Sequence, residues 1–227
     1  MTKKKTVEQL SCTDCGIYNC RNLGHEFPEF CLTTHNQGEH DIAADIAEIK
    51  QELSGDSLDA RIAHASAEVE GAFYGRITRV EEIIEFAKGI GVKKIGIATC
   101  VGLIEEAKIF ARILTARGLD YYSVICKVGA VDKTEIGIKE EYKIQPGCHE
   151  SMCNPILQAR ILNYNHTDLN VIIGLCVGHD SLFIRHSEAP VTTLITKDRV
   201  TGHNPAAALY TAHSYYKRLL QEETASK

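Results

Sequence analysis

Two segments that lie far apart in the chain share one pattern: an apolar run, then Cys-Val-Gly, then the first turn of a helix. Ile95–Ala107 reads IGIATCVGLIEEA and Val171–Phe183 reads VIIGLCVGHDSLF. A short apolar run that leads into a helix is typical of a parallel strand covered on both faces. Strands that alternate with helices build a parallel sheet with right-handed crossovers. The pattern therefore predicts an α/β fold with a cysteine directly after two of its strands.

The same reasoning predicts the other elements of the chain. We expect four strands, at 94–99, 121–127, 170–176 and 191–196. Helices are expected at 41–53, 57–72, 80–88, 103–117, 154–164, from 180, and from 204 to about 220. The segment 128–147 is ambiguous, with one helix around Lys133–Glu141 and a loop as the expected arrangement. The predicted fold is an open, mainly parallel, Rossmann-like sheet of four or slightly more strands flanked by helices.

The first 40 residues differ from the rest. They hold Cys12, Cys15, Cys20 and Cys31, with Gly, Pro, Asn and Thr scattered between them. Such a segment cannot build an apolar core alone and needs a staple. We therefore expect two parts, a small cysteine-rich metal-binding cap at 1–40 and a body at 41–227 in which a helical lead-in precedes the sheet.

The spacing of the cap cysteines, Cys-x2-Cys-x4-Cys-x10-Cys, predicts a metal centre. Four thiolates suit either one tetrahedral zinc ion or one [4Fe–4S] cluster. The spacing matches neither a zinc ribbon nor the common ferredoxin run. An iron–sulfur cluster is the favoured prediction, with zinc as the alternative and a redox dithiol as a third reading. One of His25, His35 and His40 could replace a cysteine, although ordinary surface histidines would look the same.

Composition narrows the class of protein. The formal charge is −5 and no segment is strongly basic, so neither nucleic acid nor an anionic membrane is an expected partner. No apolar run is long enough to span a membrane, and no secretory signal is recognisable, so a cytoplasmic protein is expected. The nine cysteines are unusually many and odd in number. In a reducing compartment they are expected to serve a metal or redox role rather than structural disulfides.

The carboxyl ends of parallel strands meet at one edge of a sheet, where ligands of open α/β folds bind. Cys100, Cys126 and Cys176 follow three of the expected strands, and Cys148 and Cys153 lie in the connection that returns to the third. A helix beginning beside a thiol favours its thiolate form. Three or four of these five cysteines are predicted to hold a second cluster, of the [4Fe–4S] type, although any one of them alone could be an ordinary core residue.

Other polar residues are expected at the same edge. Cys100, Cys176, His179 and Lys197 are the predicted catalytic residues, and Lys197 with Arg199 could hold an anionic group of a substrate. A polar turn before a capped helix at Asn204 would explain the same residues without a ligand. His149 and Glu150 could transfer protons, or could simply be exposed.

The motifs together resemble a known family. The order Cys-x2-Cys-x4-Cys near the start, then IATCVGL, GCHESMCNP, GLCVGHDSLF and APVTTLITKDRVTGHNP, is similar to prokaryotic proteins known only as predicted metal-binding proteins of unknown function. The resemblance covers roughly residues 10–215. It implies metal binding through Cys12, Cys15, Cys20 and Cys31 and no established reaction. The family is found more often in anaerobes, which is consistent with an oxygen-sensitive cluster.

Three functions are consistent with these features. The first is an iron–sulfur-dependent oxidoreductase, or a sulfur-transfer or desulfurising enzyme, acting on a small molecule; within this class a low-pKa cysteine nucleophile without a cluster is an alternative. The second is a non-catalytic carrier, metallochaperone or sensor of metal, sulfide or electrons that serves a redox partner protein. The third is a binding module stapled by zinc. A homo-oligomer is possible in each case.

Overall fold

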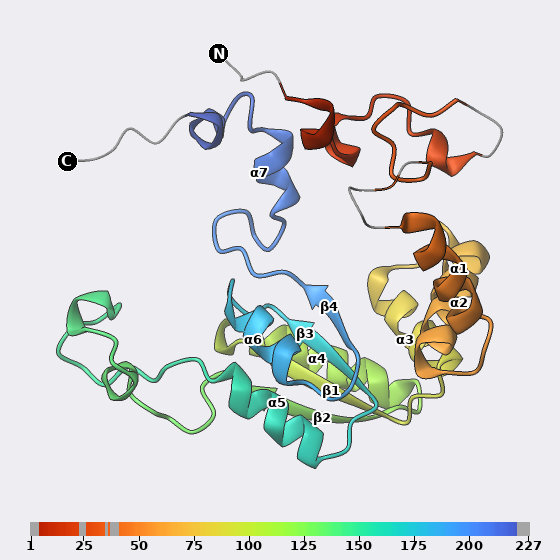
Figure 1. Ribbon diagram of the computed structural model, residues 1–227. Helices are drawn as coiled ribbons and strands as arrows, with labels where there is room; N and C mark the ends of the chain where they lie inside the picture. The colour runs from red at the N-terminus through yellow and green to blue at the C-terminus, as the bar shows by residue number, and fades with distance from the viewer. Residues whose placement is uncertain (1–4, 23–25, 35, 37–40, 222–227) are drawn as a thin grey trace. The chain divides into compact units, whose positions relative to one another are not determined.

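The computed structural model describes residues 5–22, 26–34, 36 and 41–221 (Figure 1). The chain divides into two compact units, Met1–Ala67 and Glu68–Lys227, and the boundary falls within one helix.

The first unit consists of short turns followed by helices. Single 3-10 turns form at Val7–Gln9, Cys12–Asp14 and Asn19–Arg21, and α1 (Ile42–Leu53) and α2 (Leu58–Phe73) follow. Asp41 caps α1, because its carboxylate accepts the amide N–H groups of Ala43 and Ala44. None of the described side chains of the cap or of α1 is buried. The cap is therefore a segment without an apolar core, as its composition indicates.

The second unit contains a four-stranded parallel sheet, which confirms the predicted fold class. The strands are β1 (Lys94–Thr99), β2 (Asp120–Ile125), β3 (Leu169–Ile173) and β4 (Val191–Ile195), in the order β2-β1-β3-β4. All three pairings are parallel. The two central strands are almost entirely buried, as expected for strands covered on both faces.

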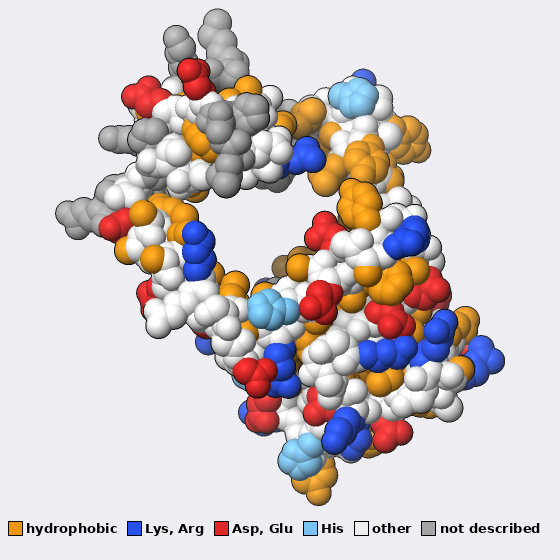
Figure 2. Space-filling view, turned by 90° about the vertical axis from the view of Figure 1, so that its right-hand side faces the viewer, with side chains coloured by type: hydrophobic (Ala, Val, Ile, Leu, Met, Phe, Trp, Pro, Cys, Tyr) orange, Lys and Arg blue, Asp and Glu red, His pale blue; other side chains and the backbone are white. Residues whose placement is uncertain are grey.

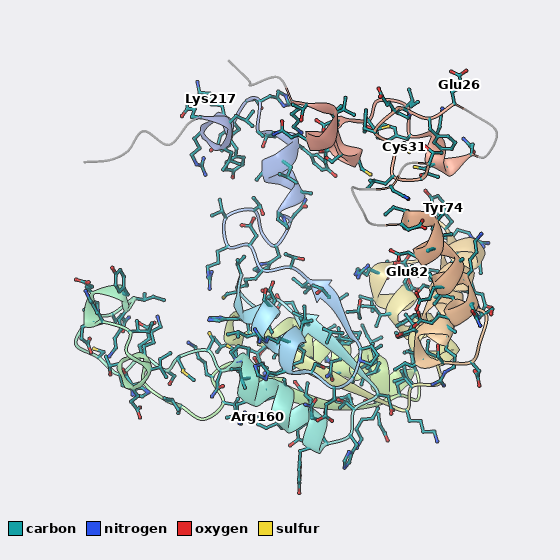
Figure 3. The ribbon with its side chains drawn as sticks, viewed as in Figure 1. Glu26, Cys31, Tyr74, Glu82, Arg160 and Lys217 are labelled. Atoms are coloured by element: carbon teal, nitrogen blue, oxygen red, sulfur yellow. The ribbon has the colours of Figure 1, made fainter. Side chains whose placement is uncertain are left out.

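Helices cover both faces of this sheet (Figure 1). α5 (Pro155–Tyr164) and α6 (His179–His186) pack on the face that carries Ala98 and Ile172, through Leu162 and Phe183, while Arg160 stays exposed on the outer side of α5 (Figure 3). α4 (Ile104–Ala116) packs against β1 and β2, and α3 (Arg79–Gly89) against β4. The Thr78–Glu81 capping box opens α3 as predicted.

The third strand is shorter than predicted. β3 ends at Ile173, where 170–176 was expected, because Gly174 has φ of +69° and turns the chain out of the sheet. A side chain at Gly174 would also collide with Leu103, since an added Cβ would lie 1.8 Å from its Cδ1 atom. β2 likewise ends at Ile125 rather than Lys127. Cys126 thus comes directly after β2, and Cys176 comes three residues after β3.

The ambiguous segment 128–147 and the residues that follow it up to 152 form a lobe that leaves the sheet after β2 and returns before α5 (Figure 1). It contains two 3-10 turns, Lys133–Ile136 and Glu140–Tyr142, in place of the expected helix. Its interior is polar: the Lys143 side chain is 3 % exposed, and its ammonium lies 2.9 Å from Asp132 Oδ1 and 2.7 Å from Glu140 Oε1. Its apolar side chains Ile136, Tyr142 and Ile144 are exposed rather than packed on another element, so little stabilises a longer helix.

The last helix is also shorter than predicted. α7 spans Ala206–Tyr210, and only a 3-10 turn at Lys217–Leu220 follows, whereas a helix to about residue 220 was expected. Leu209 and Tyr210 are 73 % and 75 % exposed, so no apolar face is packed to stabilise further turns. Within the described residues, no helix has both the length and the apolarity to cross a membrane.

The visible surface of the second unit carries mixed charge. In the lower part of Figure 2, Lys and Arg side chains are interspersed with Asp and Glu, with no broad patch of one sign among the described residues on that face.

Candidate active site

The carboxyl ends of β1, β2 and β3 bring cysteines from separate parts of the chain together. Cys100 and Cys126 directly follow β1 and β2, and both are buried, at 5 % and 1 % exposure. Cys153 lies two residues before α5. It is half-buried and packs against the apolar core cluster to which Cys100 and Cys126 belong. We call Cys100, Cys126, Cys153 and Cys176, which follows β3, the rim thiols.

Three of the rim thiols touch one another. The Sγ atoms of Cys126 and Cys153 are 3.8 Å apart, within hydrogen-bond distance for sulfur. Cys126 also bonds through its thiol to Cys100, and its sulfur accepts the Val101 amide at 3.4 Å. The imidazole of His179, the first residue of α6, bonds to the sulfur of Cys153. The sulfurs therefore form a continuous row of contacts that begins at Cys100 and ends at an imidazole.

Positive side chains face both ends of this row. The Lys197 ammonium lies 3.4 Å from the Cys100 sulfur, in space left by Gly102, where an added Cβ would come within 3.1 Å of the Lys197 nitrogen. Arg199 donates to the Cys176 sulfur at 3.1 Å. Lys127 acts on Cys153 through its charge. Cations beside thiols stabilise the thiolate form.

The thiols at the two ends of the row are acidic. The pKa of Cys153 falls to about 4, chiefly through the hydrogen bond from Cys126, then through His179 and the charge of Lys127. The pKa of Cys100 falls to about 5, again chiefly through Cys126, with contributions from the Gly102 amide and Lys197. Both cysteines are therefore thiolates at neutral pH, and the thiolate is the form of cysteine that attacks electrophiles.

Cys126, in the middle of the row, is a weaker acid than an ordinary thiol. The pKa of Cys126 is raised, first because hydrogen bonding to Cys100 and then to Cys153 favours its protonated form, and then because of burial and the negative charge of Cys153. The pKa of His179 is raised by the Cys153 sulfur. A protonated Cys126 therefore lies between two acidic thiols, and the Cys153 sulfur favours the protonated form of the His179 imidazole.

Cys148 does not join the rim thiols. It is exposed in the lobe, where its carbonyl oxygen accepts the Lys143 ammonium at 3.1 Å. His149 and Glu150 belong to the same lobe: Glu150 forms an ion pair with Lys133, and His149 bonds to Ser151 at 3.0 Å. These residues build the lobe and do not contact the row of sulfurs through any described hydrogen bond.

A cavity opens beside β4, near Cys100, the end of the row that Lys197 faces. It has a volume of about 550 Å³, and its polar lining includes Arg79, Glu106 and His203. Leu103 lines it as well and packs over Gly174 next to the Lys197 stem. The cavity and the Cys100 thiol are thus neighbours across Lys197. Arg79 is fixed there by donating to the Thr193 carbonyl at 2.7 Å.

The four cap cysteines line a different cavity, one of about 80 Å³ within the first unit. Cys15 and Cys31 are half-buried there, and Cys12 and Cys20 are exposed; Figure 3 labels Cys31. The Tyr18 amide donates to the Cys15 sulfur at 3.4 Å. The pKa of Cys31 is lowered by the Thr33 hydroxyl and by the amides of Thr33 and Thr34. His25, His35 and His40 lie outside the described residues.

The thiol-rich donor sets suit soft metals, and N–H groups directed at the cap sulfurs are typical of thiolate ligands. In the part of the chain that the structure describes, however, no group of three or more His, Cys, Asp or Glu side chains is placed to hold a metal ion. At the rim the thiols touch in series. In the cap they share a cavity, and a common ion would require them to move closer together. The cluster assignments therefore stay predictions.

Sequence reasoning placed Cys153 among the ligands but missed its pairing with His179. The two residues are 26 positions apart and meet only because α5 and α6 begin at the same edge of the sheet. The signal was present in the sequence as a cysteine just before one helix cap and a histidine at the start of the next helix.

A family model matches residues 36–194, with the description "Protein of unknown function (DUF1847)". The matched residues include Cys100, Cys126, Cys153 and Cys176 and stop short of Lys197; the cap cysteines precede them. A similar protein, described as "Uncharacterized protein MJ0455" from Methanocaldococcus jannaschii, is 54 % identical over 161 residues, which are 71 % of this chain and 81 % of the relative. No solved structure matches the chain.

Proposed function

The chain belongs to the DUF1847 family, and we propose that it performs thiolate chemistry, redox or sulfur transfer on a small molecule, at the rim thiols. One observation carries this proposal: the half-buried Cys153 lies against His179 on one side and against a second thiol, 3.8 Å away, on the other. A cysteine paired with an imidazolium is an activated nucleophile.

The residues of the site have different roles in this proposal. Cys153 attacks, because it is the acidic thiol of the row that solvent reaches, whereas Cys100 and Cys126 are buried. His179 stabilises the thiolate and can return a proton to a leaving group. Lys197 and Arg199, which face the Cys100 and Cys176 sulfurs, supply positive charge near an anionic substrate.

The proposal predicts fast alkylation of Cys153 in acid. At about pH 5 a thiol of pKa about 4 is almost fully ionised and reacts about 25-fold faster than an ordinary thiol, although its thiolate is intrinsically less nucleophilic. Near pH 7 the ordinary thiol is ionised to a larger extent, so the acidic thiol reacts more slowly than the ordinary one. Site-resolved labelling with iodoacetamide measures this, with the same cysteine in the urea-unfolded chain as reference. Equal rates in the folded and unfolded chain at about pH 5 would refute the proposal.

A metal centre in the cap is the second candidate function, favoured by the shared cavity of Cys12, Cys15, Cys20 and Cys31. A [4Fe–4S] cluster or a zinc ion there would hold the core-less first unit together, because metal binding energy becomes folding energy in such segments. A cluster would in addition supply one-electron chemistry when bound. The cap residues would serve as its ligands, with amide N–H groups supporting the sulfurs.

A further inference from the structure

We propose that Cys126 and Cys153 form a reversible disulfide in the reaction cycle, with small disulfides as the substrate class, Cys153 as the attacking thiol and Cys126 as the resolving thiol. This inference rests on the proposed function and specifies the chemistry of the same site. It begins from the 3.8 Å separation of the two sulfurs.

The backbone already holds the two cysteines together. The Asn154 amide donates to the Cys126 carbonyl at 2.7 Å, so the chain that leaves β2 at Cys126 is bonded to the chain that follows Cys153. The Met152 amide donates to the Val131 carbonyl at 2.8 Å, and the Lys127 ammonium to the Ser151 carbonyl at 2.5 Å. These bonds fix the neck of the lobe. Closing a bond of about 2 Å between the sulfurs then requires side-chain rotation rather than movement of the fold.

Exposure decides the order of attack. Cys126 is 1 % exposed and cannot meet a solute directly, whereas Cys153 is half-buried and open on one side. A disulfide from solution therefore reacts first with Cys153. Cys126 can attack only a sulfur that is already attached to Cys153, which is the geometry of a resolving thiol.

The atoms and electrons balance without a further reagent. The Cys153 thiolate attacks one sulfur of the disulfide RSSR, the S–S bond breaks, and the leaving RS⁻ takes a proton from the His179 imidazolium. Once Cys153 carries the RS group, its negative charge no longer raises the pKa of Cys126. Cys126 then passes its proton along their hydrogen bond to Cys100 and attacks the Cys153 sulfur, and the second RS⁻ leaves and takes that proton from Cys100. Two cysteine thiols have been oxidised to one disulfide, and RSSR has been reduced to two RSH.

Peptide mapping tests this on the full chain. The reduced protein is treated with 2-hydroxyethyl disulfide, quenched with N-ethylmaleimide and digested with trypsin. Cys126 then lies in the peptide 118–127 and Cys153 in 144–160, which also contains Cys148, so a Cys148→Ser background keeps the assignment unambiguous. We expect these two peptides to be linked, with no adduct left on Cys153.

Two variants identify the roles. Cys126→Ala is expected to accumulate a stable mixed disulfide on Cys153, and Cys153→Ser to form neither the adduct nor the link. The matched variant Cys100→Ala, at the other buried thiol, keeps the link but slows its formation by roughly 100-fold, because the proton acceptor is lost. Circular dichroism of each variant reports whether it folds, and the mapping of the parent chain does not depend on them.

The outcomes distinguish a failure of the proposed thiolate chemistry from a failure of the proposed disulfide alone. An unreactive Cys153 would refute the proposed function and this inference together. A Cys153 adduct that persists although Cys126 is present, or a link between Cys126 and Cys100, would overturn the inference alone. Iron or zinc that is lost on Cys153→Ser substitution would show that these thiols are metal ligands, and would overturn it as well.

Discussion

The cap and the rim are both rich in cysteine, yet they are built in opposite ways. In the cap, four cysteines lie within twenty residues on short 3-10 turns and irregular chain, with no buried side chain among the described residues. At the rim, four cysteines spread over 77 residues follow the ends of three neighbouring parallel strands, of which the central two are buried, or precede the start of α5. If a metal orders the cap thiols, as proposed, while the fold orders the rim thiols, the two clusters should respond differently to the same change.

The family match follows the same division. It begins at residue 36, so it includes the rim thiols and leaves the cap cysteines outside. The rim is therefore the thiol cluster that lies within the segment defining the family.

The largest effect is expected from removing a cap cysteine. Cys31→Ser should abolish metal binding by the cap, because structural thiolate sites contribute about 10–16 kcal/mol of apparent binding free energy and rarely survive the loss of a ligand. Quantitation of iron, zinc and acid-labile sulfide after anaerobic purification measures it. Cys153→Ser is the matched control, and should keep the full metal content.

The same experiment can break the comparison. If Cys153→Ser removes metal and Cys31→Ser does not, the rim is the metal centre and the cap is not. About four iron with sulfide would indicate a cluster, and one zinc without iron would indicate a structural ion.

A smaller effect is expected from single methyl groups. Gly174→Ala places a Cβ 1.8 Å from Leu103 Cδ1 at a φ of +69°, and should destabilise the second unit by about 2–5 kcal/mol through strain and overpacking. Gly118→Ala has a similar φ of +72° with open space around it, and should cost only about 1–2 kcal/mol. Urea unfolding followed by circular dichroism measures both.

A glycine-to-alanine change in the cap tests whether the cap is less tightly packed than the second unit. Gly16, next to Cys15, has nothing within 4 Å of an added Cβ, so Gly16→Ala should change stability by less than about 0.5 kcal/mol. Equal costs at Gly16 and Gly174 would mean that the rim is no better packed than the cap.

The regular part of the fold was predictable because local signals suffice for it. β1 spans 94–99 as expected, and α5 begins after Asn154 and at Pro155 as the cap and proline indicate. The end of β3 was not predictable, because the apolar run continues through Leu175 while the turn depends on a positive φ at Gly174. The predicted helices at α7 and in the lobe were wrong for a related reason. The sequence does not show whether a helix has another element to pack against.

The candidate site was predictable as a place and not as a set of contacts. The rule that parallel strands end at one edge correctly brought Cys100 and Cys126 together. It could not distinguish Cys148 from Cys153, which are five residues apart, because the ion pairs of Lys143 and the bond between Asn154 and Cys126 decide which of them faces the rim. Such contacts between distant segments become visible only in the folded chain.

The central claim is that the fold itself creates thiolates at Cys153 and Cys100, and the ultraviolet absorbance of thiolates tests it most directly. The difference spectrum between the parent chain and Cys153→Ser cancels the cap cysteines, and should show one thiolate that persists from neutral pH down to about pH 5 and disappears as pH falls through about 4. His179→Gln, with His186→Gln of the same helix as control, should move that loss upward by about 1–3 pH units, since an opposite charge is removed. A Cys153 thiolate that appears only above about pH 8, as for an ordinary cysteine, would contradict the account.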